Sequence, residues 1–327
     1  MLKSFEGKVV AITGAASGIG RALSLELARR GAVVALADID EEGLAHTTEA
    51  VRRVALAREQ TVAYGVSTCW GTKRTAEGGT ECKRRRPFSS AARVDVADRY
   101  QVHEWAEQVV AEHGRVNMIV NNAGVALGAQ VTTMSYEDLA WIMGINFWGV
   151  VHGTKEFLPH LEASGEGHIV NLSSVFGLIG IPTQSAYSAA KFAVRGFTES
   201  LRIELDIAGS KVSCSCVYPG GIKTAIARNA RVEPATAAMA GGEDGAKAWM
   251  EKMFITSPEA AARAILAGVE RNRRRILVGY DARVFLLLSC LPAGSYQKIV
   301  GKVVAKGLST AQGRSRPGPV VAKRGVG

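Results

Sequence analysis

The sequence predicts an α/β fold, an open, doubly wound parallel sheet of about seven strands in a single domain. Two observations carry this prediction. Short apolar runs without polar alternation, which are typical of strands covered on both faces, alternate with amphipathic helical stretches from the first residues onward. A glycine-rich turn also follows directly on the first apolar run, where a doubly wound sheet places its nucleotide-binding loop.

The individual elements follow from the same pattern. Residues 8–13 (KVVAIT) and 32–38 (AVVALAD) are apolar runs of strand length. Gly31 marks the end of the helix that lies between them. The remaining expected elements are helices at 17–30, 41–57 and 99–113, a strand end just before Asp95, and strands at 118–122, 168–174, 212–220 and 275–279.

Two segments interrupt this pattern and hold most of the excess positive charge. Residues 66–93 lack any period and carry a net charge of +5, and residues 301–327 carry +6, so the rest of a chain of net charge +10 is close to neutral. We interpret 66–93 as a disordered surface insertion and 301–327 as a basic Gly/Pro-rich tail after a catalytic domain at 1–300. Because the charge sits outside the body of the domain and no nucleic-acid motif accompanies it, we expect no nucleic-acid partner.

Cysteine spacing and the length of the apolar runs argue against a zinc site, a secreted protein and a membrane-spanning protein. None of the five cysteines shows zinc-ligand spacing, no metal site is expected, and a reduced, cytoplasmic setting follows. Cys214 and Cys216 lie two apart in an apolar run and are expected in the core. No secretory signal is expected, and the apolar run at 284–291 is too short to span a bilayer. That run is expected to cap the core, with peripheral contact to a membrane as the alternative.

The glycine-rich turn is the first candidate binding element. In TGAASGIG (13–20), Gly14, Gly18 and Gly20 permit a tight turn that lets the backbone approach a pyrophosphate, and the following helix offers free N–H groups to the anion. A glycine-rich turn without a ligand is the alternative.

Acidic and amide side chains at the ends of the later strands are further candidate binding residues. Asp38 can accept hydrogen bonds from an adenosine ribose and repel a 2′-phosphate, which favours NAD over NADP, although it could also cap a helix. Asp95 could bind an adenine amino group or cap the next helix. Asn122, Ala123 and Gly124 end the fourth strand, where small residues allow a cofactor to approach and amides can tie strands together.

Together these motifs resemble the short-chain dehydrogenase/reductase family, in its compact branch with a Rossmann-type fold. The resemblance rests on TGAASGIG, Asp38, NNAG (121–124), Asn146 in INFWG, Ser174 in NLSS, the Tyr187-x-x-x-Lys191 pair and PGGIKT (219–224), in the order and spacing of that family over residues 5–225. It implies the following cofactor-binding residues: Gly14, Ser17, Gly18, Ile19, Gly20, Asp38, Asp95, Val96, Asn122, Ala123, Gly124, Tyr187, Lys191, Pro219, Gly220, Ile222 and Thr224.

The resemblance also implies the catalytic roles. Tyr187 and Lys191 are one helical turn apart and lie on one helix face. Tyr187 is expected to be the general acid/base, with a pKa lowered by the ammonium group and by a nicotinamide cation. Ser174 would polarise the substrate oxygen, and Asn146 would hold a water in a proton relay to Lys191.

The predicted function is therefore oxidoreduction, in which hydride moves between NAD and a secondary alcohol or ketone. Val175, Phe176, Leu178 and Ile179 are expected to line a hydrophobic substrate pocket under a lid at 225–256. An NADPH-dependent 3-ketoacyl (acyl-carrier-protein) reductase and a non-catalytic dinucleotide-binding scaffold are the alternatives. The family resemblance implies a homodimer or homotetramer built on helices near 137–163 and 184–208.

Overall fold

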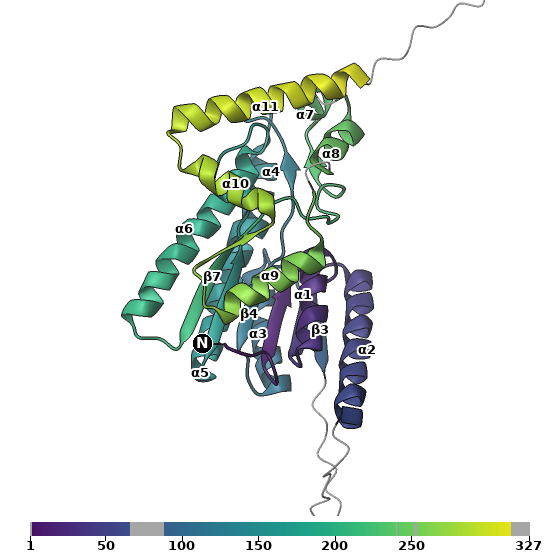
Figure 1. Cartoon of the computed structure of the whole chain (residues 1–327), viewed down its shortest axis with the longest axis vertical. Coiled ribbons are helices and arrows are strands. Elements are labelled where there is room, and N and C mark those ends of the chain that lie inside the picture. Colours follow the sequence, from purple (N-terminus) through teal and green to yellow (C-terminus); the bar gives the residue numbers. More distant parts are fainter. Residues whose placement is uncertain (1, 66–87, 240, 252–253, 315–327) are drawn as a thin grey trace, which may run out of the picture.

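The computed structural model describes residues 2–65, 88–239, 241–251 and 254–314 (Figure 1). Its centre is an all-parallel seven-stranded sheet, which confirms the predicted α/β class. The strands lie in the order β3-β2-β1-β4-β6-β7-β9. They are β1 (Val9–Thr13), β2 (Val33–Asp38), β3 (Ser89–Arg93), β4 (Met118–Asn121), β6 (Gly167–Leu172), β7 (Val212–Pro219) and β9 (Arg275–Val278).

Helices cover both faces of this sheet. One face carries α1 (Gly18–Arg29), α2 (Glu41–Gly65) and α9 (Pro258–Glu270), and the other carries α3 (Arg99–His113), α5 (Gly149–Ala163) and α6 (Ser185–Ile207) (Figure 1). In β1, Val10 and Ile12 belong to the first core, and Val9 and Ala11 belong to the second. Both sides of the strand are therefore buried, which explains why its sequence is apolar without alternation.

The chain order of the strands reverses between β1 and β4. β1 pairs with β2 on one side and with β4 on the other, all in parallel. The loops that follow these strands therefore diverge at the carboxyl edge of the sheet and leave a crevice there. Within the described residues, no helix is long and apolar enough to cross a membrane, and no cluster of side chains is suited to hold a metal ion.

The expected insertion at 66–93 needs a correction at its end. Residues Ser89–Arg93 form β3, the edge strand, which pairs with β2 in the register Val34↔Ser89. An edge strand is held by backbone hydrogen bonds and needs little apolar side-chain surface, so its SSAAR sequence gave no strand signal. Helix α2 likewise continues past the predicted end at 57 to Gly65. The remainder of the insertion, with Cys69 and Cys82, lies outside the described residues.

The expected tail from 301 onward is wrong as far as residue 314. Helices α10 (Tyr280–Ser289) and α11 (Ala293–Arg314) follow β9, and α11 lies across one end of the molecule (Figure 1). The reason is an apolar stripe at i, i+4 and i+8, formed by Tyr296, Val300 and Val304, which packs with Ile179 and Phe285. Residues 298–307 also contain two glycines and three lysines, which make that stripe hard to recognise in the sequence. Residues 315–327 lie outside the described part.

The region predicted as a lid, 225–256, contains short elements. These are β8 (Arg231–Val232), α7 (Pro234–Met239) and α8 (Glu243–Glu251). Strand β8 pairs with β5 (Leu127–Gly128), so this region is attached to the loop after β4. The remaining elements are α4 (Tyr136–Met143), the π-helical turn η1 (Gly144–Trp148) and the 3₁₀ turn η2 (Val175–Gly177).

Candidate active site

A single cavity at the carboxyl edge of the sheet brings together most of the predicted site residues. Its volume is about 370 Å³. Ligand pockets are commonly about 300–1,000 Å³, so the cavity is large enough to hold a small-molecule ligand. Every predicted site residue lines this cavity except Gly20 and Asn146.

The glycine turn after β1 is shaped by contacts that leave no space for side chains. Gly14 has a φ of +66°, and a Cβ there would lie 2.8 Å from Ala123 Cα. A Cβ on Gly20 would lie 2.0 Å from the Gly14 carbonyl oxygen, so Gly20 acts by letting α1 pack on the turn. The first turn of α1 contributes Gly18 and Ile19 to the cavity wall, where its free N–H groups suit a pyrophosphate.

Asn122 ties the end of β4 to this turn. Its Nδ2 donates to the Thr13 carbonyl at 2.9 Å and to the Gly14 carbonyl at 3.0 Å. Thr13 Oγ1 accepts from the backbone N–H groups of Asn122 and Ala123 at 3.0 and 3.1 Å. The side-chain amide of Asn122 is thus engaged in structure, while its remaining surface lines the cavity.

Two carboxylates lie on the cavity wall beyond the glycine turn. Asp38 Oδ2 accepts from Ala16 N at 2.9 Å and Oδ1 from Asp40 N at 3.1 Å, which orients the carboxylate at the end of β2. Asp95 does not cap the next helix. That role belongs to Asp98, which accepts from the N–H groups at the start of α3, and Asp95 instead accepts from Ala97 N at 2.9 Å.

The predicted catalytic pair lies in the first two turns of α6. Lys191 is only 4% exposed, and its Nζ donates to the Leu172 carbonyl at 3.0 Å. The same Nζ lies 5.7 Å from the centroid of the Tyr187 ring. Ser173, which the sequence reading did not single out, donates from Oγ to the Lys191 carbonyl at 2.8 Å and so fixes α6 against β6. Ser174 Oγ accepts from Phe176 N at 3.2 Å, and the hydroxyl lies near enough to the Tyr187 phenol to act on its pKa.

The electrostatics of this pair differ from the expectation. Burial raises the pKa of the Tyr187 phenol, and the contact with Ser174 opposes that rise without overcoming it. Burial also lowers the pKa of Lys191 to about 8. Without a cofactor, Lys191 does not offset the effect of burial on the pKa of Tyr187, and the expected lowering by the ammonium group together with a nicotinamide cation stays a prediction. Desolvation of the phenolate is the larger effect, so a further positive charge or donor is required beside Tyr187.

Asn146 is placed differently from its predicted role. It lies in the π-helical turn η1 and is fully buried. Its Oδ1 accepts from Val125 N at 2.8 Å, and its Nδ2 donates to the Val125 carbonyl at 2.9 Å. Both side-chain groups thus hold the loop after β4, and the structure does not bring them to the cavity wall. A Cβ on Gly124 would lie 3.2 Å from Asn146 Oδ1 and 3.5 Å from Lys191 Nζ, so Gly124 separates the two.

The loop after β7 lines the cavity, and it is held by a residue that sequence reasoning missed. Asp281, in the first turn of α10, accepts from Gly221 N at 2.6 Å. A Cβ on Gly220 would lie 2.1 Å from the same oxygen, Oδ2. The Gly221 carbonyl in turn accepts from the N–H groups of Ile255 and Thr256, both at 3.0 Å. The sequence signal was an aspartate two residues after Gly279, the glycine that follows β9 with a φ of +97°.

The part of the cavity around Tyr187 is lined by aromatic and aliphatic side chains. Phe176 lies edge-on to Tyr187 with ring centroids 6.1 Å apart, and Phe285 lies 6.1 Å from Phe176. Phe254 and Phe285 line the cavity although the sequence reading did not name them. The reading was wrong for Leu178 and Ile179, which point into the protein.

Leu178 and Ile179 serve the interior instead. Leu178 packs with Cys216 and Tyr218, and Ile179 packs beneath α11. The 3₁₀ turn η2 between Ser174 and Leu178 turns the chain away from the cavity after Phe176. Both cysteines of β7, Cys214 and Cys216, are buried as predicted.

Thr224 completes the cavity opposite the glycine turn. A Cβ on Gly18, whose φ is +54°, would lie 3.0 Å from Thr224 Cγ2. Pro219, Gly220 and Ile222 line the cavity on the same loop. The turn after β1 and the loop after β7 therefore approach each other across the site.

Comparison with known proteins agrees with this arrangement. The profile of the short chain dehydrogenase family matches residues 8–66 and 55–235. The chain is 44% identical over 308 residues to SadH of Mycobacterium tuberculosis, which is named as an oxidoreductase without a stated substrate. That match covers 93% of this chain and 98% of SadH. It is 36% identical over 219 residues to the 3-oxoacyl-[acyl-carrier-protein] reductase FabG of Thermotoga maritima, a match that covers 67% of this chain and 76% of FabG.

A solved structure also matches. It is a short chain dehydrogenase/reductase from Burkholderia phymatum, determined in complex with NAD. The TM-score is 0.72 at 29% identity, and the match covers 88% of this chain and 94% of that chain.

Proposed function

Since the chain belongs to the short-chain dehydrogenase/reductase family of NAD(P)-dependent oxidoreductases, we propose that it moves a hydride between NAD and a hydrophobic secondary alcohol or ketone. The observation that carries this proposal is the convergence of Ser174, Tyr187 and Lys191 on one cavity whose other end holds Asp38. A dinucleotide bound along that cavity would place its two ends at chemically different groups.

The residues present fit a nicotinamide dinucleotide. Gly14, Ser17 and Gly18 line the cavity beside the first turn of α1, whose free N–H groups suit a phosphate, and Asp38 offers carboxylate oxygens to a ribose. Lys191 Nζ and the loop at 219–224 would hold the nicotinamide half. When bound, the cofactor supplies the hydride acceptor or donor and, in its oxidised form, a positive charge.

The side chains of this protein would handle the proton. In the oxidative direction, Tyr187 takes the proton of the substrate hydroxyl, and Ser174 donates a hydrogen bond to the substrate oxygen. Because burial raises the pKa of Tyr187, the phenolate depends on positive charge beside it. Lys191, with its pKa lowered to about 8, lies close enough to contribute such charge near neutral pH.

For cofactor choice, we propose NAD over NADP. Asp38 lines the cavity at the end of β2, where it would meet the adenosine ribose, and its neighbour Ile39 offers no cation for a 2′-phosphate. A carboxylate at that position would repel the additional phosphate. The same argument speaks against the NADPH-dependent 3-ketoacyl reductase alternative, although FabG is among the relatives.

For substrate class, the aromatic wall formed by Phe176, Phe254 and Phe285 supports a bulky apolar alcohol or ketone. Residues 225–256 would act as the lid of this pocket. Exposed apolar side chains on η1 and α6 support a homodimer or homotetramer, with Trp148 51%, Ile203 55% and Ile207 83% exposed. Free thiols at Cys214, Cys216 and Cys290 fit a reducing, cytoplasmic setting.

The test is a screen of secondary alcohols and ketones of increasing size with NAD and NADP, followed by absorbance at the nicotinamide band. We expect turnover with NAD and a preference for large apolar substrates. Tight NAD binding without turnover on the whole panel would favour the non-catalytic scaffold. Turnover with NADPH and acyl-thioester ketones alone would favour the ketoacyl reductase.

A further inference from the structure

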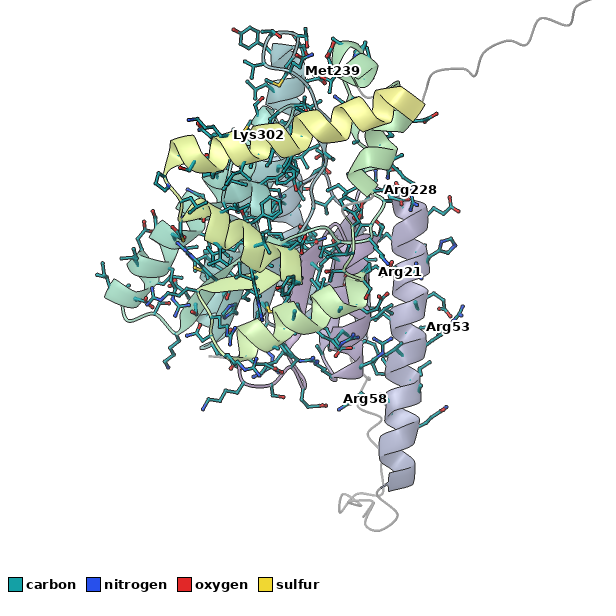
Figure 2. The ribbon with its side chains drawn as sticks, turned by 45° about the horizontal axis from the view of Figure 1, so that its top comes forward. Arg21, Arg53, Arg58, Arg228, Met239 and Lys302 are labelled. Atoms are coloured by element: carbon teal, nitrogen blue, oxygen red, sulfur yellow. The ribbon has the colours of Figure 1, made fainter. Side chains whose placement is uncertain are left out.

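We propose that the outer face of helices α10 and α11 binds the surface of an anionic phospholipid bilayer. We use the term outer face for five exposed apolar side chains: Val284 and Leu287 on α10, Leu291 in the link between the helices, and Ile299 and Val303 on α11. The two helices follow the last strand, and α11 lies across one end of the molecule (Figures 1 and 2).

The two helices are amphipathic in a way that burial in the monomer does not explain. On α10, Ala282 is fully buried, and Phe285 and Leu286 pack toward the core. The opposite side of α10 carries Val284 and Leu287, and Leu287 is 71% exposed. Capping of the domain therefore uses only one face of the helix.

Helix α11 also carries exposed apolar side chains beside its packed stripe. Tyr296, Val300 and Val304 pack on Ile179 and Phe285 beneath the helix. Ile299 and Val303 are one turn apart along the edge of that stripe, and Val303 is 65% exposed. Phe285 packs with residues of α11, so the two helices are in contact with each other.

Charge decides which kind of partner fits. From Ala282 to the last residue the sequence holds eight Lys and Arg residues and no Asp or Glu. Arg283, Lys298 and Lys302 are exposed, and none of them forms an ion pair with a carboxylate within the described part of the chain. Lys302 is labelled on α11 in Figure 2. Apolar side chains flanked by unpaired cations are typical of helices that lie in a bilayer interface.

Other occupants fit less well. A second copy docked through the same face would bring two acid-free, basic segments together, and their like charges would repel. Nucleic acid would satisfy the cations, but the exposed aliphatic side chains provide no surface on which bases stack. An anionic bilayer accommodates both features at once.

The location of this face gives the contact a consequence. Asp281 and Phe285, on the inner side of α10, line the catalytic cavity. Helix α10 is thus the wall between the cavity and the outer face. On a bilayer, the cavity would lie one helix diameter from the lipid, which suits an enzyme whose substrate is apolar.

The experiment is vesicle flotation of the full-length protein with phosphatidylcholine vesicles, with and without 30% phosphatidylglycerol. We expect binding to the vesicles that contain phosphatidylglycerol and little binding to phosphatidylcholine alone. Leu287→Ser/Val303→Ser should weaken binding at least tenfold. The matched control is Val131→Ser, since Val131 is 71% exposed but lies outside these helices.

Charge is tested separately. Lys298→Gln/Lys302→Gln should weaken binding to the anionic vesicles by about 20- to 30-fold, or about fivefold for each lysine. Lys3→Gln/Lys211→Gln removes the same charge from exposed positions elsewhere and should have no such effect.

Three results would overturn the proposal. The first is an absence of wild-type binding at millimolar anionic lipid. The second is a change in oligomeric mass, by light scattering, in Leu287→Ser/Val303→Ser, which would assign the face to a second copy. The third is equal binding of that variant and wild type to vesicles and to duplex DNA, which would show a general polyanion contact. Because the readout is binding, these results are independent of any turnover.

Discussion

Replacement of Asp38 by alanine should shift cofactor preference from NAD toward NADP. The carboxylate lies on the cavity wall, with Oδ2 2.9 Å from Ala16 N and Oδ1 3.1 Å from Asp40 N. These bonds orient it where the ribose of a nucleotide held by the glycine turn would lie. The substitution removes an acceptor for the ribose 2′-hydroxyl and a negative charge near a 2′-phosphate.

The magnitude follows from the two interactions. Two unit charges about 4 Å apart interact by about 4 kcal/mol at an effective dielectric of about 20. Asp38 is partly exposed, so screening by solvent reduces this figure, and we take about 2 kcal/mol. Loss of a charged hydrogen bond to the ribose adds about 1.5 kcal/mol against NAD. Together these terms predict a fall of roughly 100-fold or more in the ratio of kcat/KM for NAD to that for NADP.

The assay is steady-state kinetics of Asp38→Ala with both cofactors and one alcohol. Asp40→Ala is the matched control, because it removes the same charge two residues away, where the side chain caps α2 by accepting from Gly43 N at 3.0 Å. The control should leave the ratio within about threefold while costing roughly 1 kcal/mol of stability. An NAD/NADP ratio in Asp38→Ala that equals that of Asp40→Ala would refute the assignment.

Three further perturbations test other parts of the site. Gly14→Ala should weaken NAD binding more than tenfold by titration, whereas Gly7→Ala, with the same φ of +66° but nothing within 4 Å of its Cβ, should not; equal effects would implicate backbone strain alone. Burial lowers the pKa of Lys191 to about 8, so its contribution to the free energy of unfolding should rise as pH increases from about 8 to 10.5. The stability of wild type relative to Lys191→Met, by urea unfolding, should therefore grow by up to about 3 kcal/mol over that range, and a constant difference would contradict the burial argument. Asp281→Asn should raise the KM for NAD about tenfold, because the Gly221 N–H loses a charged acceptor; an unchanged KM would show that the loop does not depend on this bond.

The sheet could be predicted from sequence because its strands are buried on both faces. Val9 to Ile12 of β1 face two cores in alternation, so all four of these positions are apolar. The edge strand Ser89–Arg93 was not predicted, because backbone pairing with β2 stabilises it and its side chains leave no apolar pattern in the sequence. Helix α11 could not be predicted because its apolar signal is also weak. Its buried stripe of Tyr296, Val300 and Val304 is narrow, and glycine and lysine lie between these positions.

The site could be predicted where residue types and spacing coincide with the chemistry. Ser174, Tyr187 and Lys191 reach one cavity because strand β6 and helix α6 place them at its edge. Long-range contacts could not be read from the chain. Asp281 meets Gly221 across 60 residues, and Asn146 is turned onto Val125 by a π-helical turn. The sign of the pKa shift at Tyr187 also depended on how deeply the fold buries the phenol, which spacing does not report.

In the proposed reaction, the Tyr187 hydroxyl is the group that exchanges the substrate proton. The most direct measurement is the rate of hydride transfer by Tyr187→Phe at saturating NAD, with the NAD dissociation constant determined on the same protein. Phenylalanine keeps the edge-on contact with Phe176 and removes only the hydroxyl. We predict a loss of at least 100-fold in rate with NAD affinity changed less than threefold. A rate within a factor of five of wild type, with NAD still bound, would contradict the account.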